Sequence, residues 1–244
     1  ARSLGPIYYN KNIQMAINVN AVYKTVLLIL NQQQRGYMTP DEFNKVATQV
    51  QLNIFEKYED DLNQMYRVPQ NDTEYANRVK NIEENLQFFQ RTGTTAGANP
   101  FTLVPTDIYR LGTVMYKSVE LTQYAQRNEL MQILKSPLTQ PTATFPIYLY
   151  ENNQLFVYPT SIITPGDVTF SYLKTPADVA WGYSIGALGQ FLYASGTSTN
   201  FELNISEQTN VVTRILAYAG VIINDPTIIQ VAQAETQQEE QNSK

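Results

Sequence analysis

The chain has 244 residues, enough for one large domain or two small ones with a sizeable buried core. It contains no cysteine and no histidine, which excludes disulfide frameworks, cysteine nucleophiles, Ser–His–Asp triads and zinc sites with the usual ligands. The formal net charge of −5 offers no overall basic surface for nucleic acid.

Neutral polar residues take the place of charged ones. Only 16% of residues are charged, against roughly 25% in ordinary soluble proteins, while the chain has 21 Asn, 22 Gln, 24 Thr and 17 Tyr. Neutral polar groups and Tyr make surfaces that lose little free energy on desolvation, which favours an assembly subunit. Compositional bias from an AT-rich genome explains the same counts.

The start of the chain reads as an extension, residues 1–14, in front of Met15, which resembles a natural start. The sequence leaves open whether this extension is ordered, translated from upstream or appended. The longest apolar run is Val26–Leu30, far short of the roughly 20 residues that span a bilayer, so no membrane anchor is predicted.

The first helix is predicted over residues 20–33, with Asn20 as N-cap and Gly36 just beyond its end. Its apolar residues recur at helical spacing. They are Val22, Val26, Leu27 and Leu30.

The stretch RGYMTPDEF predicts the start of a second helix. Thr39 is the expected N-cap, Pro40 takes the first helical position and Glu42 completes a capping box. A calcium loop is excluded, because the third and fifth positions counted from Asp41 hold no oxygen ligand and no glycine follows.

A third helix is predicted from about residue 72, with apolar residues in alternating steps of four and three, as in a coiled-coil seam. Residues 92–100, TGTTAGANP, read as a flexible link. FTLVP reads as a short strand, and residues 107–116 are ambiguous between helix and strand.

The next segments predict a short helix over residues 127–135 and then three strands in an antiparallel meander. An edge hairpin within GQFLYASGTSTNFEL is a further option. The meander strands are FPIYLY, QLFVYP and DVTFSYL.

The last helix is expected from residue 205, with Asn204 and Glu207 as a second capping-box-like pair. The predicted fold is therefore α+β in a single domain, residues 15–225, followed by a polar C-terminal segment, residues 226–244, that is partly disordered alone. The domain has a helical bundle over 15–95, an antiparallel β region over 96–204 and a buried C-terminal helix over 205–225.

No motif predicts a catalytic, cofactor-binding or metal-binding residue. The carboxylates of Glu59, Asp60 and Asp61 are adjacent on a helix and point apart, which favours a solvated face. Trp181 and Tyr183 are candidate contacts with a partner or with another copy, although a single Trp is more often a core residue.

Four stretches carry a resemblance: MAINVNAVYKTVLLILNQQQRGYMTPDEFNKVATQVQLNIFEKYEDDLNQMYR, KSPLTQPTATFPIYLYENNQLFVYPTSI, VTFSYLKTPADVAWGY and FELNISEQTNVVTRILAYAGVIINDPTIIQVAQAE. Together they resemble virion structural proteins of crAss-like and related short-tailed phages, over about residues 15–235. The order of helices, β region, buried helix and polar tail is also similar to that of head-to-tail adaptor, or ring, proteins beneath the phage portal.

The resemblance implies a non-enzymatic subunit without cofactors, made in the host cytoplasm and located in the virion at the head–tail junction or in the tail. It implies a ring of twelve copies that joins the portal protein to neighbouring tail or ring proteins. Genomic DNA would pass through this ring without sequence-specific binding. The segment 226–244 would dock on a neighbour, with Ile228, Ile229 and Val231 as contacts.

Two alternatives stay open at this point. One is a minor capsid or tail-tube component of the same virion. The other is a hydrolase that brings distant Asp and Glu side chains together, as glycosidases do.

Overall fold

The described residues form two compact units. The helical unit takes the described residues up to Phe88 and those from Pro176 onward, and the β unit takes Phe89–Thr175. Helices and a mainly antiparallel sheet occur together, which confirms the predicted α+β class. The computed structural model describes residues 16–32, 37–67, 73–117 and 120–223, together with Ala234 and Gln237.

The division of the chain differs from the single domain predicted over residues 15–225. The β unit begins before the predicted β region, 96–204, and ends at Thr175. Residues 176–204 therefore belong with the helices.

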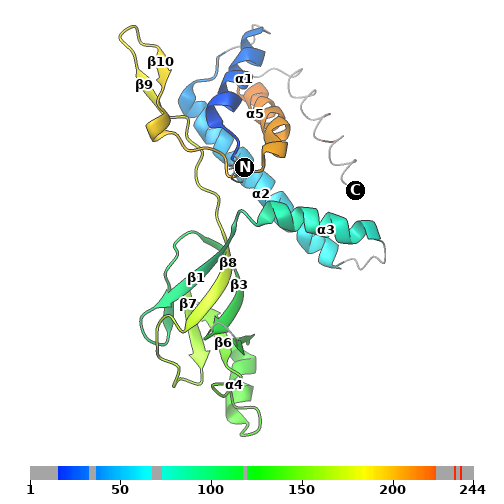
Figure 1. The fold of residues 1–244 in the computed structure, drawn as a ribbon, viewed down its shortest axis with the longest axis vertical. Helices are drawn as coiled ribbons and strands as arrows, with labels where there is room; N and C mark the ends of the chain where they lie inside the picture. The colour runs from blue at the N-terminus through cyan, green and yellow to red at the C-terminus, as the bar shows by residue number, and fades with distance from the viewer. Residues whose placement is uncertain are drawn as a thin grey trace, which may run out of the picture. The chain divides into compact units, whose positions relative to one another are not determined.

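In the helical unit, α1, α2 and α5 each bury one face. Helix α5 packs against α1 and α2, and α3 runs along α2 (Figure 1). The buried residues recur at helical spacing, as the sequence predicts. Its elements are α1 (Val19–Gln32), α2 (Pro40–Arg67), α3 (Thr73–Leu86), β9 (Tyr183–Ile185), β10 (Phe191–Tyr193), the 3-10 turns η1 (Ser195–Thr197) and η2 (Ile205–Glu207), and α5 (Gln208–Ile223).

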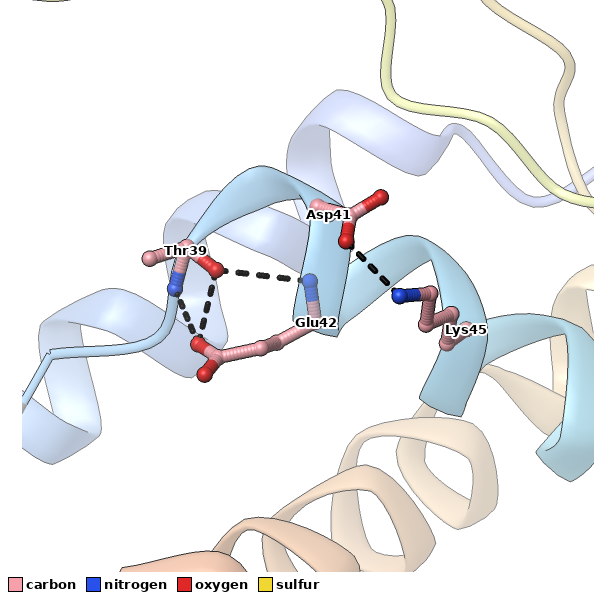
Figure 2. A network of polar contacts seen from close by, with 4 residues as sticks. All are labelled: Thr39, Asp41, Glu42 and Lys45. Atoms are coloured by element: carbon pink, nitrogen blue, oxygen red, sulfur yellow. Dashed lines mark hydrogen bonds and ion pairs between the residues drawn. The ribbon is translucent and has the colours of Figure 1, made fainter.

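The capping box at the start of α2 is confirmed (Figure 2). The Thr39 N–H donates to Glu42 Oε2 at 2.9 Å, and the Glu42 N–H donates to Thr39 Oγ1 at 3.4 Å. Asp41 forms an exposed ion pair with Lys45, 2.9 Å away and one turn further along. The stretch that contains these residues is therefore a helix start.

The other two predicted caps differ in detail. The cap of α1 is Asn18 and not Asn20, because the Asn18 Oδ1 accepts the N–H of Asn20 at 2.9 Å. The Asn204 Oδ1 accepts the N–H of Ser206 at 3.1 Å and so begins η2, while the Glu207 carboxylate accepts from Asn210. A 3-10 turn thus precedes α5, which begins three residues later than expected.

The β unit contains one sheet, in which the strands follow the order β4-β3-β8-β1-β2-β7-β6-β5. Its one helix, α4, lies between β5 and β6 in the sequence. The segment 107–116, left ambiguous by its pattern, forms a strand from Ile108 onward, and residues 127–135 form the predicted short helix. The elements are β1 (Gln90–Ala96), β2 (Phe101–Leu103), β3 (Ile108–Tyr116), β4 (Glu120–Leu121), β5 (Gln123–Tyr124), α4 (Arg127–Lys135), β6 (Ile147–Glu151), β7 (Gln154–Tyr158) and β8 (Val168–Lys174).

The two ends of this sheet meet in one continuous segment. β4 pairs with β3, β5 pairs with β6, and only Thr122 separates β4 from β5. The buried Thr122 donates both its N–H and its hydroxyl to the Val114 carbonyl, at 3.1 and 2.7 Å. The sheet is therefore closed into a small barrel, which leaves no long open edge.

The interior of the barrel is an apolar cluster drawn from strands on all sides. Alternate residues of β2, β3, β7 and β8 point into it, as the period of two requires. Its buried members are Phe101, Leu103, Val114, Tyr116, Tyr148, Leu155, Val157, Ile162, Val168, Phe170 and Tyr172.

The predicted meander is only half correct. β6 and β7 form the expected hairpin, and Asn152 and Asn153 at its turn have φ of 51° and 58°, the left-handed region that tight hairpin turns need. β8, however, lies between β1 and β3 and does not pair with β7. The predicted link 92–100 is also wrong in its first half, which belongs to β1.

Candidate functional site: the β9–β10 hairpin

An extended segment, residues 176–182, leads from the end of the β unit into the β9–β10 hairpin. Polar side chains of α2 form hydrogen bonds with the backbone of this segment. Asn44 binds both backbone groups of Trp181: its Oδ1 accepts the N–H at 2.6 Å and its Nδ2 donates to the carbonyl at 3.4 Å. Thr48 binds both groups of Val179 in the same way, at 3.1 and 3.4 Å. These side chains satisfy the backbone hydrogen-bonding groups of the segment, as a neighbouring β-strand would.

Gln51 continues this row on α2. Its Nε2 donates to the Ala177 carbonyl at 2.7 Å, and its Oε1 accepts the Glu202 N–H at 2.8 Å, so the buried amide is satisfied at both ends. The three α2 residues stand about one helical turn apart, and the three bound residues alternate along the extended segment. One turn and two extended residues have similar lengths, about 5.4 and 6.6 Å, so the two rows stay in register.

Trp181 lies at the centre of an aromatic cluster. Its ring centroid is 4.5 Å from Tyr23, 6.0 Å from Tyr183 and 5.7 Å from Tyr193, and Tyr23 in turn lies 4.7 Å from Phe43. Such tilted and offset contacts are favourable for aromatic rings. The cluster joins the helix core to the base of the hairpin.

The polar atoms within this cluster are satisfied. The Trp181 indole N–H donates to Asn20 Oδ1 at 3.1 Å, and the Tyr23 hydroxyl donates to the Met38 carbonyl at 3.0 Å. Burial, and next the hydrogen bond with Tyr37, raise the pKa of Tyr23 above its usual value. Tyr23 therefore stays neutral and remains a donor throughout the physiological range.

Beyond this base the hairpin exposes nearly every apolar side chain that it carries, and it extends away from the helices of its own unit (Figure 1). Tyr193 pairs with Tyr183 and Phe191 with Ile185 across the two strands. Ile185 is 69% exposed and Leu188, at the turn, is 92% exposed. An apolar projection on a fixed base is a typical site for binding another protein.

The hairpin lies in an uncharged stretch of the chain. No Asp, Glu, Lys or Arg occurs between Asp178 and Glu202. Cores of protein–protein interfaces are likewise poor in charged residues and rich in Tyr, Trp and Phe.

The residues predicted as contacts fall into three groups. Trp181 is buried within the helical unit, at only 5% exposed, and its ring packs against Tyr183 and Tyr193 at the base of the hairpin. Tyr183 is exposed at the base of the hairpin, at 38%. Ile228, Ile229 and Val231 lie outside the described residues.

Reasoning from the sequence missed the polar row on α2. The signal is present: Asn44, Thr48 and Gln51 follow one another at helical spacing beside the apolar stripe. Neutral polar residues in such a row can form hydrogen bonds with the backbone of an extended segment. Part of the high Asn, Gln and Thr content therefore has a structural role.

The comparisons with known proteins leave the family open. No protein-family model matches the chain, and no curated protein matches it. Among the described residues, no three metal-ligand side chains gather into a group, and no helix is long and apolar enough to cross a bilayer.

Proposed function

We propose that this chain is a non-enzymatic structural subunit of a phage virion, a ring protein of the head-to-tail connector. The exposed, uncharged β9–β10 hairpin carries the proposal. It presents apolar and aromatic side chains to the outside, whereas a subunit that works alone gains nothing from them. The resemblance of the sequence to virion proteins of short-tailed phages supports the virion as the assembly to which the subunit belongs.

The rigid base of the hairpin also supports an assembly role. The aromatic cluster and the α2 side chains fix the hairpin's origin before binding, so less conformational entropy is lost on association. Subunits that meet through contacts related by a rotation close into rings. Twelve such copies would join the portal protein to the neighbouring tail or ring proteins.

The charge of the chain suits a passage for DNA. With a net charge of −5, the chain neutralises few phosphates, so genomic DNA would slide through the ring and would not be held at any sequence. The ring would reside in the virion, at the head–tail junction or in the tail.

Native mass spectrometry and negative-stain microscopy test this proposal with the full chain, alone and mixed with purified portal protein. We expect closed rings, and complexes in which a ring sits on the portal. A chain that stays monomeric in both conditions and does not bind portal would contradict the proposal.

A further inference from the structure

The hairpin forms a sheet that is incomplete by itself. Within the described part of the chain, β9 pairs only with β10 and β10 only with β9, so each strand has one open edge. An isolated two-stranded sheet is marginally stable in water. Open edges and exposed apolar side chains together favour a partner that covers both.

The hairpin's turn is ordered in spite of this exposure. The Gly186 N–H donates to the Gln190 carbonyl at 2.8 Å, the Gly189 N–H donates to the Gly186 carbonyl at 2.9 Å, and the Leu188 N–H donates to Gln190 Oε1 at 3.0 Å. These bonds hold Leu188 outward at the tip, where it is 92% exposed. The exposed shape is thus built into the chain before any partner arrives.

The absence of charge selects the kind of partner. Nucleic acid and anionic membranes are bound through Lys and Arg, and between Asp178 and Glu202 the chain has neither. The two residues at the flanks are acidic and would repel both. A strongly basic or acidic partner protein would likewise find no opposite charge along the hairpin.

A second copy of this chain meets none of these obstacles. Two copies, each with a net charge of −5, repel one another wherever charged surfaces face each other, and least where the surface is neutral. A neutral apolar hairpin is therefore the place on the helical unit where copies approach at the lowest electrostatic cost. Main-chain pairing at an open strand edge adds hydrogen bonds to the buried apolar area.

We infer that the β9–β10 hairpin is the surface through which one copy binds a second copy of the same chain. This inference rests on the proposed function, because it names the contact that joins the subunits. The exposed side chains of Ile185, Leu188 and Leu192 supply the apolar area, and the strand edges supply the main-chain groups.

The test compares the wild-type chain with the variant Ile185→Lys/Leu188→Lys. Both side chains are more than half exposed, so the changes leave the core intact, and thermal unfolding checks that they do. The matched control is Leu138→Lys/Phe145→Lys in the β unit, where the two side chains are 94% and 76% exposed. Variant and control add the same charge, so a difference between them is due to position.

Sedimentation velocity over a range of concentrations, with and without purified portal protein, gives the readout. We expect the wild type and the control to assemble, and the hairpin variant to self-associate about tenfold or more weakly, the loss typical of an interface centre. A folded hairpin variant that assembles like the wild type would overturn the inference but leave the proposed function standing.

Two further outcomes are informative. A wild-type chain that neither self-associates nor binds portal would defeat the proposed function and the inference together. Co-sedimentation with vesicles of neutral phosphatidylcholine, lost in the hairpin variant while the wild type stays monomeric, would overturn the inference in favour of a lipid surface.

Discussion

Thr39 and Glu42 show what a pair of residues contributes at the start of a helix. The Thr39 hydroxyl and N–H both donate to the Glu42 carboxylate, and these bonds, the side-chain one first, lower the pKa of Glu42. The carboxylate is therefore ionised at neutral pH and complements the positive end of the helix dipole.

We predict that Thr39→Ala lowers the free energy of unfolding by about 1 kcal/mol, the usual cost of a lost N-cap. Urea unfolding at pH 7 measures this. Thr25→Ala is the matched control, because the Thr25 hydroxyl only donates to the carbonyl of Ala21 within α1. Equal effects of the two substitutions would show that Thr39 does not act as a cap.

At the scale of the element, close packing at its base fixes the β9–β10 hairpin. Gly182 follows Trp181, and a Cβ placed there would lie 2.7 Å from the backbone carbon of Thr197 and 2.8 Å from the carbonyl oxygen of Ala194. Neither backbone atom can move without displacing η1. The base therefore tolerates only glycine.

We predict that Gly182→Ala destabilises the protein by about 1–3 kcal/mol, as overpacking usually does. Gly196→Ala, a few residues away, is the control, because a Cβ there has nothing within 4 Å. Thermal unfolding of both variants measures the difference. An unchanged melting temperature for Gly182→Ala would mean that the hairpin base is loosely packed.

The molecule as a whole consists of one unit inserted into another. The Lys174 N–H donates to the Phe89 carbonyl at 2.9 Å, so the two ends of the β unit lie side by side. The barrel has its own apolar core and is closed on itself. Such a unit depends little on the rest of the chain.

We predict that residues 89–175 fold when expressed alone. Far-UV circular dichroism should show β structure, and urea should unfold the fragment in one cooperative transition. The same fragment with Phe170→Ala should lose much of this stability, by about 3–5 kcal/mol, because the ring is fully buried in the barrel. A wild-type fragment without a cooperative transition would show that the barrel needs the helical unit.

The features that the sequence alone determined are local ones. The cap at Thr39, the apolar stripes of the helices and the hairpin of FPIYLY and QLFVYP each depend on residues that lie within a few positions of one another. The α+β class followed from these patterns. Periodicity and turn chemistry act over such short distances, so they can be read without the fold.

The tertiary structure decided the features that join distant residues. Gly93 lies in a stretch that reads as a link, but it pairs with Phe170 across two strands, and that ring fills the space a side chain would need. Gln51 is polar and buried, because the backbone that satisfies it comes more than a hundred residues later. Closure of the barrel and the fixed base of the hairpin depend on such partners, which the spacing of residues along the chain does not reveal.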